Sequence, residues 1–118
     1  GTTDELSSEA EIDLMTALPG SGAAYPALMA VAMAGFMRAQ GVADAIAWRA
    51  AEAAVVGGAR LLERRITEAP ALVAAYRDYR GTTAAGLEAA EAAGFSRAVV
   101  AALEAATEKA RRMAEGPA

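Results

Sequence analysis

Two short segments of the sequence carry residue types that bind small anions. Gly20-Ser21-Gly22 and Gly81-Thr82-Thr83 each precede a predicted helix. The first turn of a helix presents N–H groups without intrahelical acceptors and a partial positive charge, so it readily binds a carboxylate or a phosphate. The hydroxyl groups of Ser21, Thr82 and Thr83 add donors. Brought together, the two helix ends could hold a small anionic substrate; ordinary helix capping is the alternative.

The side chains that most catalytic and metal sites use are missing. The sequence has no histidine and no cysteine, which removes the commonest general base, the commonest metal ligand and all thiolate or disulfide chemistry. Glu88 with Glu91, and Glu104 with Glu108, fall on common helix faces, but without a third acid we interpret both pairs as solvated charge and expect no metal site. No predicted strand precedes Gly20-Ser21-Gly22, so that segment does not predict a dinucleotide site.

Composition favours an all-α fold and a partner chain. The 118 residues suit one domain, and the 55% hydrophobic content is mostly alanine, the best helix former, with only 5% aromatic residues. Small side chains bury little area each, so stability must come from long helix contacts or from another subunit. The net charge of −4 argues against a nucleic-acid partner. We interpret Arg60, Arg64 and Arg65, interleaved with Glu63 and Glu68, as a solvated helix end, with anion binding as the alternative.

A membrane segment is not expected. The uncharged stretch from Leu14 to Met37 is interrupted by Pro19, Gly20 and Pro26. Its last part, residues 27–37, is shorter than the roughly 20 apolar residues that a membrane span needs. No basic segment precedes it, as a signal peptide would require. A cytoplasmic protein is the expectation, and residues 1–3 are interpreted as a cloning remnant.

About five helices are predicted. Residues 1–16, with Asp4 and Glu5 among their acids, are interpreted as a lead-in from a missing N-terminal domain, and residues 17–115 as the helical domain. The predicted helices and their capping residues follow in chain order: residues 23–40, ended by Gly41; residues 44–67, capped by Asp44; a short helix begun by Pro70; residues 84–93, capped by Thr82 or Thr83 and ended by Gly94; and a last helix capped by Ser96 and ended near Gly116-Pro117.

The sequences of two of these helices also predict packing contacts with another subunit or another helix. The first is apolar around most of its surface, from Tyr25 to Met37, and a helix of this kind must be buried on most sides. In a chain of this size we expect another subunit to cover it. Gly57-Gly58 lies inside the second helix, where each glycine costs roughly 1 kcal/mol relative to alanine. We interpret the pair as a point of close helix packing, with a local kink as the alternative.

An ordered set of motifs runs along nearly the whole chain. The stretch Ala17–Tyr25 resembles the element A-L-S-G-S-G-P-A-Y, and Gly81-Thr82-Thr83 with Gly86-Leu87 resembles S-P-G-G-T-T-x-x-G-L. Both elements belong to the C-terminal domain of pyrroline-5-carboxylate reductases. Three further stretches resemble motifs of the same domain. Val56–Ala59 with Leu61-Leu62 resembles V-L-G-A-A-K-L-L, and Glu91–Phe95 with Arg97 resembles L-E-x-x-G-F-R. Glu104–Thr107 resembles E-A-A-T. The resemblance extends from about Ile12 to Met113.

The resemblance implies a fold and an activity. Members of that family form interlocked homodimers, often assembled into rings, through an all-α domain like the C-terminal domain of 6-phosphogluconate dehydrogenase. They reduce 1-pyrroline-5-carboxylate to L-proline in proline biosynthesis. NADPH or NADH would be bound by an N-terminal domain absent from this chain, which alone should be inactive. The small anionic substrate would lie at the dimer interface.

The resemblance also implies site residues. Gly81 and Thr82 would bind the substrate carboxylate through backbone N–H groups, and Thr83 through its hydroxyl and N–H. The Thr83 hydroxyl would lie near the imine nitrogen, as the catalytic group. Ser21 would help shape the site.

The sequence departs from the family pattern next to these residues. Asp78-Tyr79-Arg80-Gly81 stands where the family has S-P-G-G, so two bulky side chains replace proline and glycine. Arg80 could pair with an anionic ligand and is included among the substrate-binding residues. The alternatives are a divergent paralogue acting on another imine or small acid, and a freestanding helical oligomerisation module without reductase activity.

Overall fold

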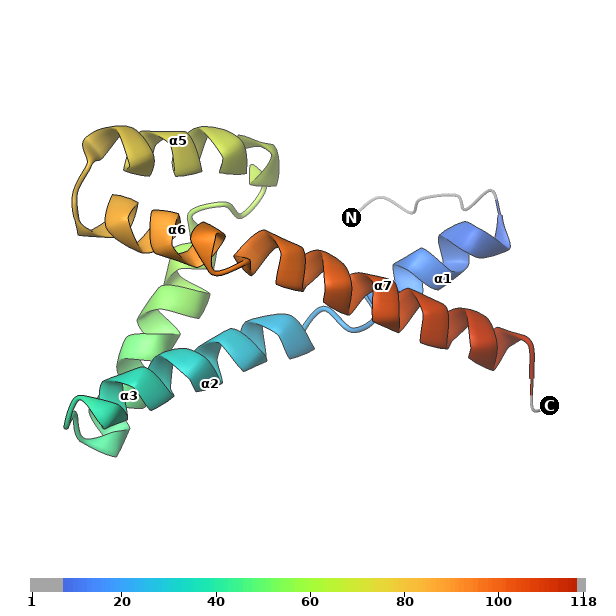
Figure 1. Cartoon of the computed structure of the whole chain (residues 1–118), viewed down its shortest axis with the longest axis horizontal. Coiled ribbons are helices and arrows are strands. Elements are labelled where there is room, and N and C mark those ends of the chain that lie inside the picture. Colours follow the sequence, from blue (N-terminus) through green and yellow to red (C-terminus); the bar gives the residue numbers. More distant parts are fainter. Residues whose placement is uncertain (1–7, 117–118) are drawn as a thin grey trace. The chain divides into compact units, whose positions relative to one another are not determined.

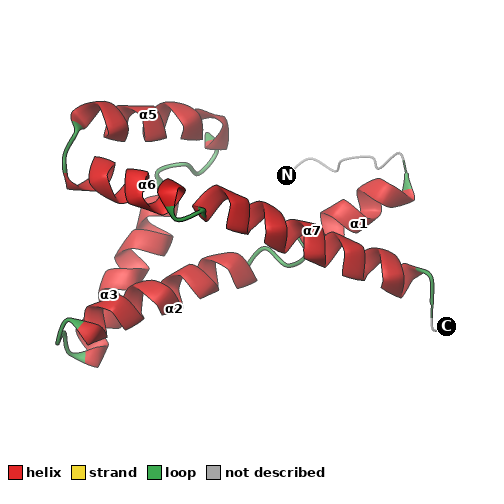
Figure 2. Ribbon diagram, viewed as in Figure 1, coloured by secondary structure: helices red, strands yellow, loops and turns green. Residues whose placement is uncertain are grey.

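The computed structural model describes residues 8–116, and this part of the chain is built from helices without any strand (Figures 1 and 2). It confirms the all-α prediction. Residues 24–90 form one compact unit, and residues 8–23 with 91–116 form the described part of a second. The predictions for residues 1–3, Asp4, Glu5 and Pro117 lie outside the described residues.

Helix α2 (Ala24–Ala39) begins and ends close to the predicted positions. Gly41 ends it in the left-handed region, with φ of +91°. The Gly41 N–H donates to the Arg38 carbonyl at 2.9 Å, and the Val42 N–H donates to the Met37 carbonyl at 3.1 Å. These two bonds satisfy carbonyl groups that the last helical turn leaves free. The structure confirms Gly41 as the residue that ends the helix.

The prediction that Asp44 caps the next helix was wrong. Helix α3 (Asp44–Glu52) begins at Asp44 itself, Ala43 is the capping residue, and no side chain caps the helix. Asp44 Oδ1 instead accepts a hydrogen bond from Arg38 Nη1 at 3.4 Å. The Arg38 guanidinium also lies 5.3 Å from the centre of the Trp48 ring. A carboxylate in the first turn still stabilises the helix through the helix dipole.

The second predicted helix is not continuous to Thr67. A π-helical turn (Ala53–Gly57) follows α3, α4 (Gly58–Arg60) ends soon after it, and a 3₁₀ turn (Ile66–Glu68) precedes the next helix. A Cβ atom added at Gly57 or Gly58 would meet nothing within 4 Å. The prediction that these glycines mark close packing was therefore wrong for contacts within the described chain. Both glycines have ordinary right-handed helical backbone angles, so their backbone conformation does not require glycine either.

The core of this unit is built from alanine. Ala34, Ala47 and Ala51 are buried where α2 and α3 pack side by side (Figure 1). Partly buried Ala30, Met33, Met37 and Val42 pack against them. Among residues 8–116, no side chain larger than alanine is buried. A core this small covers only one face of α2 and leaves large apolar side chains exposed.

Helices α5 (Ala69–Tyr79) and α6 (Thr82–Ala92) complete this unit. Pro70 lies in the first turn of α5, as predicted. The prediction that Thr82 or Thr83 caps a helix starting at residue 84 was wrong, because both threonines are already helical. Their amide groups therefore belong to the first turn.

The second unit pairs the two ends of the described chain. Helix α1 (Glu9–Ala17) packs against α7 (Phe95–Ala114). The Ser8 hydroxyl caps α1 by accepting a hydrogen bond from the Glu11 N–H at 3.2 Å. Since α1 is part of this helical unit, residues 9–16 contribute to the fold, whereas the proposed domain boundary at residue 17 stays a prediction.

The prediction that Ser96 caps α7 was also wrong. Gly94 is the capping residue, in the left-handed region with φ of +96°, and Ser96 lies inside the first turn. The Ser96 N–H and hydroxyl both donate to Glu91 Oε1, at 3.2 Å and 2.6 Å. The Glu91 carboxylate thus accepts from an N–H group of the first turn that has no intrahelical partner.

Four charged side chains form a network at the end of α7. Arg111 Nε donates to Glu108 Oε2 at 3.0 Å and Arg111 Nη1 to Glu115 Oε1 at 2.6 Å. Arg112 Nε donates to Glu108 Oε1 at 3.2 Å. The hydrogen bonds from Arg111 and then Arg112 lower the pKa of Glu108 from 4.5 to about 2. The same contacts raise the pKa of Arg111.

This network predicts a pH-dependent contribution to stability. Because the pKa of Glu108 is lower in the folded state, its contribution is complete above pH 4.5 and is lost as the pH falls toward about 2. We expect Glu108→Gln to lower the thermal midpoint at pH 6, and the difference from wild type to narrow below pH 4.5. Glu104→Gln, at a carboxylate on α7 that has no ion pair among the described residues, is the matched control. A difference that stayed constant between pH 6 and pH 3 would contradict the prediction.

Candidate functional site

The turn between α5 and α6 presents a helix N-terminus with hydroxyl side chains. The first hydrogen bond of α6 runs from the Ala85 N–H to the Gly81 carbonyl at 3.2 Å. The amide groups of Thr82, Thr83 and Ala84 come before this first bonded donor and therefore have no acceptor within the helix. Both threonines are exposed. Free N–H groups at a helix end can bind a carboxylate, and threonine hydroxyls can supply further donors.

Arg80 gives the turn its shape. It lies in the left-handed region, with φ of 56° and ψ of 32°, and its N–H donates to the Arg77 carbonyl at 3.2 Å. A residue with a Cβ atom pays roughly 1–2 kcal/mol to adopt this conformation, which glycine adopts freely. The resembling motif has glycine at this position. This sequence therefore keeps the backbone conformation of a glycine turn with an arginine in place.

Arg80→Gly is expected to stabilise the chain by about 1 kcal/mol, because it removes the steric cost of the left-handed conformation. Urea unfolding followed by circular dichroism measures the change. Arg77→Gly is the matched control, since it places the same substitution inside α5 and is expected to destabilise by about 1 kcal/mol. Loss of stability in Arg80→Gly would show that the arginine side chain makes a stabilising contact in solution.

Tyr79 lies against the backbone of the same turn. A Cβ atom on Gly81 would be 3.1 Å from Tyr79 Cδ1 and 3.2 Å from Cε1. Only glycine at position 81 leaves room for the ring without a shift. The Tyr79 side chain is nevertheless 84% exposed. An aromatic ring thus borders the helix end on one side, where the resembling motif has proline.

The segment Gly20-Ser21-Gly22 has a different role from the predicted one. The Gly20 N–H donates to the Met15 carbonyl at 3.1 Å and the Gly22 N–H to the Pro19 carbonyl at 3.2 Å. The Ser21 hydroxyl donates to the Thr16 carbonyl at 3.4 Å. The interpretation of this segment as a helix end with free donors was therefore wrong for both glycines. The segment follows α1 as a tight turn, in which a Cβ atom on Gly20 would lie 2.6 Å from the Thr16 carbonyl oxygen.

The predicted site residues divide between the two units. Arg80, Gly81, Thr82 and Thr83 share the turn before α6, whereas Ser21 belongs to the unit that contains α1 and α7. A joint site that includes Ser21 stays a prediction. Tyr79 was not among the predicted binding residues. The sequence shows only that Tyr79 lies two residues before Gly81. The contact of its ring with the turn could be seen only in the structure.

Metal and membrane features are absent from the part of the chain that the structure describes. Within residues 8–116, no three acidic side chains are grouped in a way that could hold a metal ion. None of the helices described is both long enough and apolar enough to cross a bilayer.

Comparison with known proteins decides the family. The sequence model of the pyrroline-5-carboxylate reductase dimerisation family matches residues 9–113. The chain belongs to this family. A mouse (Mus musculus) protein named pyrroline-5-carboxylate reductase 3 is 32% identical over 107 residues, covering 91% of this chain and 39% of that relative. Its zebrafish (Danio rerio) namesake is 36% identical over 110 residues, covering 92% and 38%.

The relatives are much longer than the region that matches this chain. A bovine (Bos taurus) protein of the same name is 31% identical over 109 residues, which are 92% of this chain and 35% of the relative. The chain therefore spans little more than a third of the curated relatives it matches. The matched third is the dimerisation domain, as the sequence motifs predicted.

Proposed function

We propose that this chain is the dimerisation and substrate-side domain of an NAD(P)H-dependent reductase that converts 1-pyrroline-5-carboxylate to L-proline in proline biosynthesis, in the cytoplasm. The observation that carries the proposal is the α6 N-terminus. Gly81, Thr82 and Thr83 occupy the position of the family motif, and the amides of both threonines lack intrahelical acceptors. Membership of the dimerisation family supports the rest.

The chemistry assigns a separate task to each group. The substrate carboxylate accepts hydrogen bonds from the backbone N–H groups of Gly81, Thr82 and Thr83, supported by the helix dipole. The Thr83 hydroxyl would donate a hydrogen bond to the imine nitrogen as negative charge develops there during reduction. Arg80 adds a positive charge beside the turn. Ser21 stays part of the proposal as a residue that would help shape the site.

The hydride donor would be held outside the residues described here. NADPH or NADH supplies a hydride to the imine carbon when bound. Residues 8–116 contain no strand, and therefore no strand, glycine-rich turn and helix of the kind that binds a dinucleotide. The contribution of this chain is to anchor and orient the substrate and to join two subunits around it.

Exposed apolar side chains support the homodimer. Leu28, Val31 and Phe36 of α2 are 69%, 53% and 62% exposed. A monomer with so little buried surface gains little hydrophobic stabilisation, and burial against a second copy would supply it. Assembly of dimers into rings is part of the same proposal.

One observation favours a second candidate function. The Tyr79 ring lies against Gly81 and borders the turn. A ring in this position could exclude 1-pyrroline-5-carboxylate. The chain would then be an oligomerisation module, or a domain of a paralogue that acts on another imine or small acid.

The test is reductase activity of the parent protein that contains this chain. Oxidation of NADPH and NADH is followed by the loss of the absorbance of the reduced nicotinamide, with 1-pyrroline-5-carboxylate as substrate. We expect turnover by the parent and none by the 118-residue chain alone. A folded, cofactor-binding parent without turnover would exclude this substrate and favour the second candidate.

A further inference from the structure

A small pocket lies between α4 and the start of α5, at some distance along the chain from the Gly81–Thr83 turn. Its volume is about 270 Å³, which is the space of about nine water molecules. This volume is large enough for a small ligand of the size of an amino acid. The pocket lining consists of Leu61, Leu62, Arg65, Glu68, Ala71 and Leu72.

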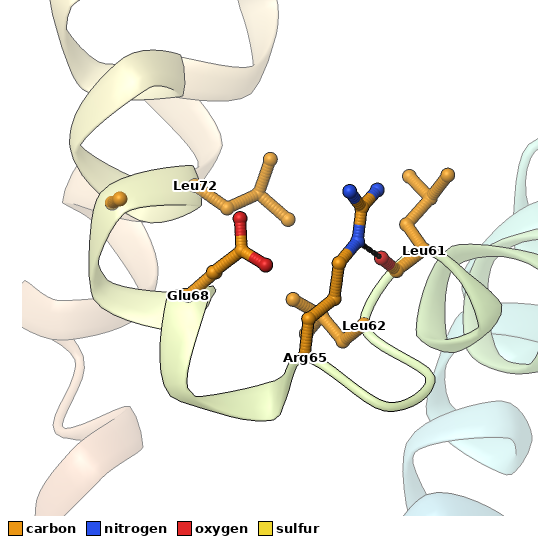
Figure 3. Close-up of a pocket in the computed structure, with 6 residues that line it drawn as sticks. Leu61, Leu62, Arg65, Glu68 and Leu72 are labelled. Carbon is orange, nitrogen blue, oxygen red and sulfur yellow. Dashed lines mark hydrogen bonds between the residues drawn. The ribbon is translucent and has the colours of Figure 1, made fainter.

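Two opposite charges border this pocket without pairing. Figure 3 shows the Arg65 guanidinium and the Glu68 carboxylate facing the same opening from opposite sides, with leucine side chains around it. No ion pair joins them, although both residues lie in the described part of the chain. Arg65 Nε donates to the Leu61 carbonyl at 2.9 Å. This bond orients the guanidinium and leaves the Nη1 and Nη2 donors free for a ligand.

The backbone that carries these two side chains forms a tight turn. Arg64 lies in the left-handed region, with φ of 66°, a conformation that costs roughly 1–2 kcal/mol. The Arg65 N–H then donates to the Leu62 carbonyl and the Glu68 N–H to the Arg65 carbonyl, both at 2.9 Å. The strained residue therefore reverses the chain between the two leucines and the two charges.

The lining selects one class of ligand. Glu68 repels a simple anion such as phosphate, and Arg65 repels a simple amine. A zwitterion satisfies both charges, because its carboxylate can accept two hydrogen bonds from Arg65 and its ammonium group can donate to Glu68. Leu61, Leu62 and Leu72 provide an apolar surface for an aliphatic side chain. We propose that the pocket bounded by Arg65, Glu68 and these leucines binds an aliphatic α-amino acid.

Titration of the ¹⁵N-labelled 118-residue chain with L-leucine tests the proposal. We expect amide shifts confined mainly to residues 61–72 and a dissociation constant in the millimolar range. Arg65→Met and Glu68→Gln should each weaken binding more than about tenfold. Arg60→Met and Glu63→Gln are matched controls that change the same charges outside the lining, and they should bind as wild type does.

Two analogues of L-leucine test the proposal without any change to the protein. 4-Methylpentanoate lacks the ammonium group and 3-methylbutylamine lacks the carboxylate, so each should bind more than about tenfold more weakly than L-leucine. Equal binding of either analogue, or no shifts at about 50 mM L-leucine, would overturn the proposal. Thr83→Ala should leave L-leucine binding unchanged, which separates this pocket from the proposed reductase site. Loss of L-leucine binding would therefore leave the proposed reductase site unaffected, and loss of reductase activity would leave the pocket unaffected.

Discussion

Val31→Glu is expected to raise the dissociation constant of the proposed homodimer by at least about 100-fold. Burying an unpaired carboxylate in an interface costs about 3 kcal/mol or more, and each 1.4 kcal/mol changes a dissociation constant about tenfold. Val31 is 53% exposed in the isolated chain, so the substitution places the new charge in solvent when the chain is monomeric. The effect should therefore fall on association rather than on the folding of the unit.

Helix α2 has two apolar faces. One face packs on α3 through Ala34 and its neighbours, as the buried cluster shows. Residues 28, 31, 32, 35 and 36 follow the spacing of a second helical face. Its large members Leu28, Val31 and Phe36 are all more than half exposed. Val31 lies between Leu28 and Phe36 along the length of this second face, where a second copy would exclude water.

Light scattering across a concentration series measures the association. Gln40→Glu is the matched control, because it adds the same charge just after the last residue of α2, beyond Leu28, Val31 and Phe36. Circular dichroism checks that each variant keeps its helices. Wild type that is a monomer at micromolar concentration would contradict the dimer itself. A Val31→Glu dimer as tight as wild type would contradict only the assignment of this face.

The helices themselves could be predicted from the sequence, because alanine-rich segments separated by glycine and proline leave few alternatives. Gly41 and Pro70 each took the predicted role. The capping residues were harder to predict. Asp44 and Ser96 are suitable types, but Arg38 binds the first and Glu91 binds the second. A cap depends on which group reaches a particular N–H, and residue type alone does not determine that.

Only part of the candidate site could be predicted from the sequence. Gly81, Thr82 and Thr83 could be found from residue type and spacing, since a helix end with hydroxyl groups has a clear physical preference for anions. The segment Gly20-Ser21-Gly22 has a composition similar to that of Gly81-Thr82-Thr83. The N–H groups of Gly20 and Gly22, however, donate to nearby backbone carbonyls. The left-handed conformation of Arg80 had no direct signal in the sequence, because arginine rarely adopts it. Its backbone conformation became visible only in the structure.

Thr83→Ala is expected to lower kcat/KM for 1-pyrroline-5-carboxylate about 100-fold in the parent protein. Removing one preorganised donor from a site of developing charge typically reduces the rate by this factor or more. Thr83→Ser keeps the hydroxyl and should restore most of the activity. Thr67→Ala is the matched control, because it makes the same change at an exposed threonine of the same unit, outside the turn.

The separate values of kcat and KM then distinguish the two roles of the residue. If the hydroxyl only holds the carboxylate, substrate and transition state lose the same contact, so KM rises while kcat stays constant. If the hydroxyl stabilises charge at the imine nitrogen, kcat falls with kcat/KM, because that contact strengthens in the transition state. The backbone N–H groups of Gly81 and Thr82 remain in the variant and continue to anchor the carboxylate. We therefore expect most of the loss in kcat, and a loss confined to KM would reassign Thr83 from catalysis to substrate binding.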